Sequence, residues 1–189
     1  FCAFCGAVFY FDEDYTPEIS EDCLYLNVYA PERAEDKLLP GMVWSHGGGY
    51  DHGHASEMEF NASKLAAQVI IVVCIQYRVH LFGFLALPEL SAENEEGVSG
   101  NYGTLDQIKA LEWVNENIEG FGGDPDNVTI CGQSAGAMSV TALLSTEMTE
   151  GLFNRAIIQS GFGGYAAPGS YVYLEYKEEK SQTKKKKKK

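Results

Sequence analysis

The order of apolar and polar residues along the 189-residue chain changes repeatedly between a period typical of strands and one typical of helices. Short apolar or alternating runs predict strands at residues 23–29, 42–45, 69–77, 128–131 and 156–159. Residues 61–68, 104–118 and 135–144 are predicted to be helical. Strands separated by helices favour βαβ units, so we expect an α/β fold with a mostly parallel sheet flanked by helices.

The clearest helical pattern is that of residues 104–118. Spacings of three and four build one apolar face, made of Leu105, Ile108, Leu111, Val114 and Ile118. Thr104 is the expected N-cap, and Gly120 is the expected end of the helix.

The regular pattern fades after Gly164. We therefore expect a first domain at residues 1–164 and a divergent, disordered, Lys-rich tail at residues 165–189. The longest apolar run, residues 69–75, has seven residues, far fewer than the about 20 that a membrane span needs. No signal-peptide pattern is present at Phe1, and a start without Met predicts that the N-terminus is incomplete.

The charge is unevenly distributed. The chain has 14 basic and 27 acidic residues, a net charge of −13. Eight of the basic residues lie in the last 13 positions, so residues 1–176 hold 6 basic and 25 acidic residues, a net charge of −19. A body this acidic repels nucleic acid and anionic membranes and tolerates neutral or cationic ligands. The run of lysines is typical of a solvated segment or of a reading frame that enters poly(A), and less so of a functional basic tail.

Five cysteines are too few, and odd in number, for a disulfide-built scaffold. Cys74 and Cys131 lie in apolar runs and are expected to be buried free thiols. The pair Cys2 and Cys5 has the spacing of a redox pair or half a metal site, but no second such pair follows. A disulfide between Cys23 and either Cys2 or Cys5 is an alternative that the sequence leaves open.

The sequence GQSAG at residues 132–136 fits the G-x-S-x-G pattern of a nucleophile elbow. Such an elbow needs a strand before it and a helix after it, because the turn holds the serine strained and its Oγ exposed. The predicted strand at 128–131 and the predicted helix at 135–144 supply both. Ser134 is therefore the candidate nucleophile, and Gly132 and Gly136 are expected to leave room for the tight turn.

A glycine run, Gly47 to Gly49 after His46, directly follows the predicted strand at 42–45. Acyl transfer places negative charge on a carbonyl oxygen and requires fixed N–H donors aimed at it. Bare backbone can approach a substrate closely, so Gly48 and Gly49 are candidate donors, and the Ala135 N–H is the third.

The segments of the chain resemble the type-B carboxylesterase and cholinesterase family of α/β-hydrolases, in the family's order, from about Ser20 to Gly161. The matching segments are residues 20–28 (SEDCLYLNV), 42–49 (MVWSHGGG), 77–78 (YR), 82–84 (FGF), 100–107 (GNYGTLDQ), 110–114 (ALEWV), 117–118 (NI), 121–125 (FGGDP), 127–130 (NVTI), 132–136 (GQSAG) and 159–161 (QSG). The resemblance implies an α/β-hydrolase fold, an acylated Ser134, and an oxyanion hole of Gly48, Gly49 and Ala135. It also implies buried ion pairs at Glu21, Arg78 and Asp106.

Two departures from the family pattern matter. Gln133 stands where many members carry Glu, which adjusts the field beside the nucleophile. The family orders its triad as serine, acid and histidine, whereas His46, His52, His54 and His80 all precede Ser134. We therefore expect this chain to correspond to the N-terminal part of such an enzyme, truncated after the elbow region, with the triad acid and histidine missing.

The leading interpretation is a serine carboxylesterase that hydrolyses a small-molecule carboxylic ester through an acyl-Ser134 intermediate, with no metal or organic cofactor. Other interpretations stay open: a non-catalytic, cholinesterase-like binding or adhesion domain, and an inactive truncated product. For the histidines, His46 is expected to brace the glycines rather than act as base. A metal at Asp51, His52 and His54 is a minor alternative, and His80 is expected at the surface or in packing.

Overall fold

The computed structural model describes residues 20–32 and 37–161. The predicted boundary between residues 164 and 165, and the tail beyond it, lie outside the described residues. The strands of the described part are β1 (Leu26–Tyr29), β2 (Leu39–Ser45), β3 (Ile71–Ile75), β4 (Gly123–Gln133) and β5 (Arg155–Gln159). The helices are α1 (Ser63–Ala66), α2 (His80–Phe84), α3 (Pro88–Glu93), α4 (Tyr102–Asn117) and α5 (Ala135–Leu143), with short 3-10 helices at Met58–Phe60, Ile118–Phe121 and Glu147–Thr149.

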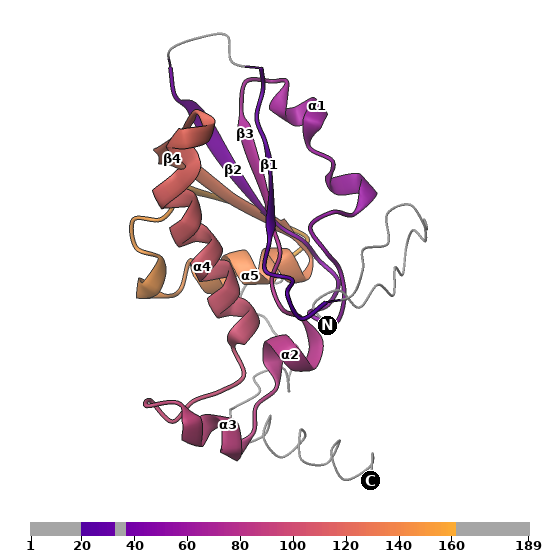
Figure 1. Ribbon diagram of the computed structural model, residues 1–189, viewed down its shortest axis with the longest axis vertical. Helices are drawn as coiled ribbons and strands as arrows, with labels where there is room; N and C mark the ends of the chain where they lie inside the picture. The colour runs from indigo at the N-terminus through magenta and orange to yellow at the C-terminus, as the bar shows by residue number, and fades with distance from the viewer. Residues whose placement is uncertain (1–19, 33–36, 162–189) are drawn as a thin grey trace.

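The strands form one sheet in the order β1-β3-β2-β4-β5, in which only β1 runs antiparallel to its neighbour (Figure 1). The predicted α/β fold with a mostly parallel sheet is thus confirmed. Every residue of β3 is buried, as expected for a β-branched run covered on both faces. The order places β2 in the centre, between β3 and β4, so the loops that follow β2 and β4 are neighbours.

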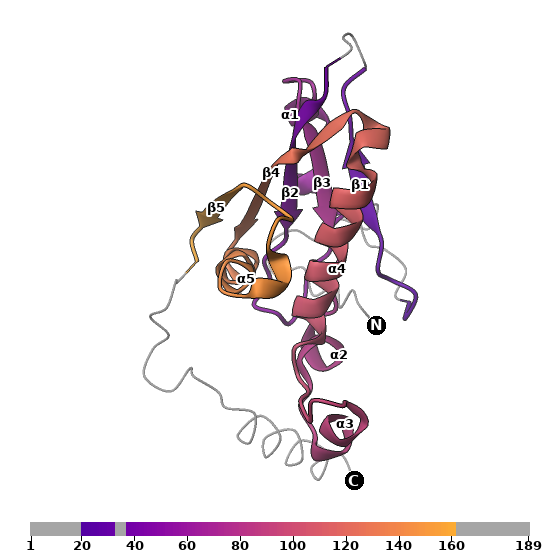
Figure 2. The ribbon, with the colours of Figure 1, turned by 90° about the vertical axis from the view of Figure 1, so that its left-hand side faces the viewer.

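Two apolar clusters cover the two faces of the sheet. The larger joins α4 and α5 to alternate residues of β2, β3 and β4, and its members include Val43, Val73, Leu111, Ile130 and Val140. The smaller lies on the other face and joins Val72 and Cys74 to Ala55, with Trp44 and Phe60 packed against it. In Figures 1 and 2, α2 and α3 project beyond the end of the sheet at which α5 lies. Within the described ranges, no helix has the length and apolarity that crossing a bilayer requires.

Most predicted elements are present with shifted bounds, and several details of the prediction were wrong. The predicted helix at 61–68 is reduced to the single turn of α1. Helix α4 begins at Tyr102, after Asn101, so Thr104 lies in its first turn and is not the N-cap. The following 3-10 helix ends at Phe121, and its C-cap is Gly122, whose φ of +85° is left-handed; this residue, not Gly120, stops the helix. Helices α2 and α3 were not predicted.

The structure tests part of what the sequence predicts for the cysteines. Cys74 and Cys131 are buried free thiols, as expected, and burial raises the pKa of Cys74 to about 11 and that of Cys131 to about 12. Both thiols therefore stay protonated and unreactive near neutral pH. Cys23 takes part in a disulfide whose partner lies outside the described residues.

Candidate active site

The candidate site lies where two neighbouring parallel strands end. Strands β2 and β4 are in register, with Ser45 opposite Gly132. The residues that follow them, His46 in one loop and Ser134 in the other, therefore emerge at the same edge of the sheet. In open α/β sheets this carboxyl edge is where ligands bind.

Ser134 occupies a tight turn between β4 and α5, as the elbow pattern predicts. Its backbone has φ 55° and ψ −120°, a region that residues other than glycine rarely adopt. The Ser134 N–H donates to the Gln159 carbonyl at 2.9 Å, which ties the turn to β5. The side chain is half-buried, and the helix that begins at Ala135 points its amino end toward the turn.

The two flanking glycines have the steric role that the sequence predicts. A Cβ on Gly132 would lie 2.4 Å from the carbonyl carbon of Gly136, so the two glycines face each other across the turn. A Cβ on Gly136 would lie 2.1 Å from the Ser45 carbonyl oxygen and 2.7 Å from that of His46. Only glycine at position 136 lets the start of α5 sit against the end of β2.

The glycine loop folds back on itself beside this turn. Gly48 has φ +101° and Gly49 has φ +65°, and the Asp51 and His52 N–H groups donate to the Gly48 carbonyl at 3.0 and 3.2 Å. A Cβ on Gly47 would lie 2.9 Å from Gln133 Oε1 and 3.4 Å from Ser134 Cβ, so the loop starts in contact with the elbow. The structure thus brings together the glycine loop, Ser134 and the first turn of α5.

The N–H groups of the three candidate donors are available to bind an oxygen atom. None of the N–H groups of Gly48, Gly49 and Ala135 donates a hydrogen bond to another residue that the structure describes. Gly49 is exposed and Gly48 is half-buried, whereas Ala135 is buried at the amino end of α5, where N–H groups have no intrahelical partner. Such a set suits an incoming negative oxygen.

His46 lies under the glycine loop, fully buried. Its ring stacks on Tyr77 with 4.3 Å between centroids, and its Nδ1 is 2.8 Å from the Gly47 carbonyl oxygen. The Tyr77 hydroxyl donates to the His46 carbonyl at 2.7 Å. Burial lowers the pKa of His46 to about 4, so the ring is neutral near pH 7. These contacts fit the expected bracing role, and the sequence pattern alone assigned no such role to Tyr77.

We expect the buried His46 to make the fold sensitive to acid. In the folded chain its pKa is about 4, against an ordinary value of 6.5, so below pH 6.5 the unfolded chain binds the proton first. The contribution of His46 to the free energy of unfolding is fully present above pH 6.5 and is lost as the pH falls from 6.5 toward 4. This group should lower the free energy of unfolding by about 2 kcal/mol between pH 8 and pH 5. Urea unfolding at both pH values tests this, with His46→Phe as reference; equal pH dependence in the two proteins would contradict it.

The other histidines do not assemble a metal site in the described part of the chain, where no group of three metal-ligating side chains is present. The His54 Nδ1 accepts a hydrogen bond from the Ser56 N–H at 3.2 Å, and burial lowers the pKa of His54. His80 is at the surface, as expected, with its Nε2 3.2 Å from Asp51 Oδ1.

The ion pairs implied by the family resemblance are present only in part. Arg78 binds Asp106 through two bonds of 2.8 Å, from Nε and Nη2, and its backbone N–H donates to the same carboxylate at 2.9 Å. The bond to Asp106 raises the pKa of Arg78. Glu21 is exposed and forms no ion pair with a described residue, so its expected burial was wrong.

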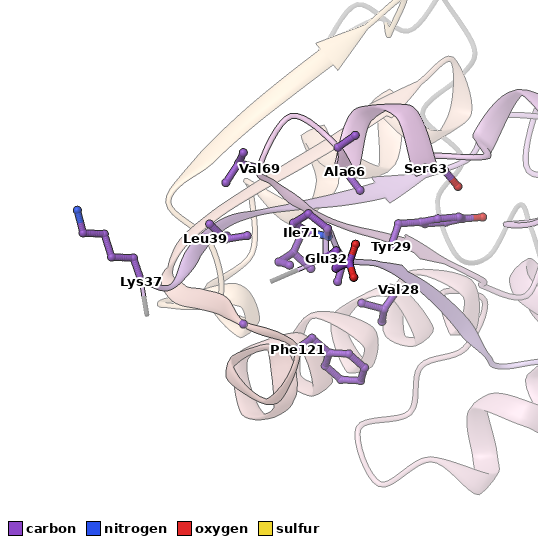
Figure 3. Close-up of a pocket in the computed structure, with 14 residues that line it drawn as sticks. Val28, Tyr29, Glu32, Lys37, Leu39, Ser63, Ala66, Val69, Ile71 and Phe121 are labelled. Atoms are coloured by element: carbon purple, nitrogen blue, oxygen red, sulfur yellow. The ribbon is translucent and has the colours of Figure 1, made fainter. Parts of the chain in front are cut away.

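A cavity of about 650 Å³ lies away from this site (Figure 3). Its lining includes Leu39 and Ile71, the first residues of β2 and β3, so it opens at the opposite edge of the sheet from Ser134. The lining is mostly apolar, and its only charged members are Glu32 and Lys37. It therefore does not belong to the candidate active site.

Comparison with known proteins identifies the family. The sequence matches the model of the carboxylesterase family over residues 5–179. The chain belongs to the carboxylesterase family. It is 53% identical to the Para-nitrobenzyl esterase of Bacillus subtilis (strain 168) over 146 residues, which cover 77% of this chain and 29% of that protein. It is 48% identical to the Fumonisin B1 esterase of Sphingopyxis macrogoltabida over 141 residues, 75% of this chain and 26% of that protein.

Solved structures of the carboxylesterase family share the fold. A thermophilic PNB esterase superposes with a TM-score of 0.72 at 51% identity, over 78% of this chain and 30% of that one. A second PNB esterase gives a TM-score of 0.70 at 53% identity, over 77% and 30% of the two chains. The α/β-hydrolase fold expected from the resemblance is therefore confirmed. The chain spans less than a third of the length of these first relatives and structures.

Proposed function

We propose that this chain supplies the nucleophile and the oxyanion hole of a serine carboxylesterase. The observation that carries the proposal is the strained backbone of Ser134, held between β4 and α5 beside a glycine loop whose Gly48 and Gly49 N–H groups donate to no described residue. Ser134 is the proposed nucleophile, and the N–H groups of Gly48, Gly49 and Ala135 are the proposed donors. A binding or adhesion role would require neither the serine nor its strain.

In the proposed reaction, the Ser134 Oγ attacks the ester carbonyl carbon while its proton passes to a general base. The negative charge that forms on the carbonyl oxygen is stabilised by the three N–H groups. The C–O bond of the ester then breaks, and the alcohol leaves with the proton. Water hydrolyses the acyl-Ser134 ester by the same steps and releases the carboxylic acid.

The general base does not come from the described histidines in this proposal. All four precede Ser134, and the ring of His46 is enclosed between Tyr77 and the Gly47 carbonyl. The family resemblance implies an acid and a histidine from later in an esterase chain. We therefore expect negligible turnover from the 189-residue chain alone; a steady ester-hydrolysis rate that Ser134→Ala abolishes would contradict this expectation.

A chimera tests the proposal. Residues 20–161 replace the aligned segment of the Bacillus subtilis Para-nitrobenzyl esterase, whose remaining chain would supply the acid and the histidine. We expect the folded chimera to hydrolyse a para-nitrobenzyl ester at least about 1,000-fold faster than the 189-residue chain, because a complete triad restores most of the rate. A chimera with native circular dichroism and no hydrolysis, beside an active parent esterase, would reject the proposal.

A further inference from the structure

The residue after the glycine run, Tyr50, contacts two helices. Its carbonyl oxygen accepts a hydrogen bond from the His80 N–H at 2.6 Å, at the start of α2. Its ring packs against that of Phe84, the last residue of α2, with 4.8 Å between centroids. Its hydroxyl lies 3.2 Å from the Oγ of Ser139, in the middle of α5. Tyr50 therefore connects the glycine loop to the helix that begins at the nucleophile.

Ser139 is the centre of a buried polar network. Its Oγ accepts a hydrogen bond from Gln107 Nε2 of α4 at 2.9 Å and lies 3.1 Å from the Ala135 carbonyl oxygen. Ser139 is 2% exposed and Gln107 is fully buried. A hydroxyl has one proton and two lone pairs. The Ser139 hydroxyl donates its proton to the Tyr50 hydroxyl oxygen and the Ala135 carbonyl oxygen, which share it, and a lone pair of the same Oγ accepts from Gln107 Nε2.

We infer that Tyr50 is a positioning residue whose contact with Ser139 fixes the glycine loop relative to α5. Two of the proposed oxyanion donors, Gly48 and Gly49, directly precede Tyr50 in the glycine loop, and the third, Ala135, begins the helix that holds Ser139. The contact therefore fixes the distance between the N–H groups of Gly48 and Gly49 on the loop and the Ala135 N–H group on the helix. Its catalytic consequence rests on the proposed function, whereas the mechanical link between loop and helix does not.

Amide hydrogen exchange in the 189-residue chain tests the link. The N–H groups of Asp51 and His52 donate to Gly48, and that of His80 donates to Tyr50, so their exchange reports how firmly the loop is held. We expect Tyr50→Phe, which keeps the ring, to raise exchange at these amides about fivefold, because it removes one hydrogen bond. Ser139→Ala should do the same, and the double variant should add nothing further. Exchange within β3 should stay unchanged.

A matched control is Tyr25→Phe, which removes an exposed hydroxyl that bonds Asp22 at 2.8 Å, and it should leave exchange in the loop unchanged. Tyr50→Phe leaves the buried Gln107–Ser139 bond intact, so it carries the test by itself if Ser139→Ala does not fold. Loop exchange in Tyr50→Phe equal to that of the unaltered chain would overturn the inference, as would single effects that simply add in the double variant.

The catalytic consequence is measured in the chimera. There Tyr50→Phe should lower kcat about fivefold and leave KM unchanged, because the donors act on the charge that develops in the transition state. An unchanged kcat in an active chimera would overturn the positioning role. A chimera with no activity at all would instead count against the proposed function, and the exchange measurements on the chain itself would still decide whether Tyr50 and Ser139 are coupled.

Discussion

Ser134→Ala in the chimera is expected to lower kcat by at least about 10,000-fold with little change in KM. Alanine removes only the Oγ, so the chain can keep the turn, the glycine loop and the candidate donors. Hydrolysis then depends on the attack of water on the ester without an acyl-enzyme intermediate. Steady-state kinetics on a para-nitrobenzyl ester measure the loss, and mass spectrometry should find a phosphonate adduct on the peptide that carries Ser134 only in the serine form.

Ser145→Ala is the matched control for this substitution. Ser145 lies two residues after the end of α5, is exposed, and donates its hydroxyl to the Thr141 carbonyl at 2.8 Å. Its removal should change kcat less than twofold, because nothing places it at the elbow. Comparable losses in the two variants, or activity that survives Ser134→Ala, would show that Ser134 is not the nucleophile.

Gly136→Ala is expected to lower the free energy of unfolding of the chain by about 3 kcal/mol or more. The added Cβ would lie 2.1 Å from the Ser45 carbonyl oxygen, and that oxygen belongs to the backbone of the central strand β2. Neither atom can swing aside as a flexible side chain does, so α5 must move away from the sheet. Urea unfolding followed by circular dichroism measures the loss.

Gly120→Ala provides the comparison. A Cβ on Gly120 would meet no atom within 4 Å, and its φ is not left-handed. Alanine there should leave stability unchanged or raise it by a few tenths of a kcal/mol, roughly, by restricting the unfolded chain. Equal stabilities for Gly136→Ala and Gly120→Ala would mean that the close approach of α5 to β2 is not required for folding.

The sheet and the elbow could be predicted from the sequence because their signals are local. The apolar run that became β3 and the spacing of apolar residues in α4 depend only on neighbouring residues. The same holds for the glycines around Ser134, since the tight turn itself excludes a Cβ. A strand, a turn and a helix in this order define where the serine must lie.

What escaped prediction depends on tertiary contacts or on very short segments. Helices α2 and α3 have five and six residues, too few for a period of 3.6 to be visible. Pro125 argues against a strand, yet β4 begins at Gly123, where it lies opposite Leu39. The network of Tyr50, Ser139 and Gln107 joins residues up to 89 positions apart, and no pattern within one segment reveals such a contact.

The backbone of Ser134 also bears on protein engineering. A residue at φ 55° and ψ −120° carries strain that glycine would relieve, since glycine has no Cβ. A library of this chain selected only for thermal resistance should therefore enrich glycine at position 134 and erase the hydroxyl. Selection for stability, or redesign without reference to related sequences, therefore needs Ser134 to be held fixed. The fold itself gives no reason to keep a serine at this position.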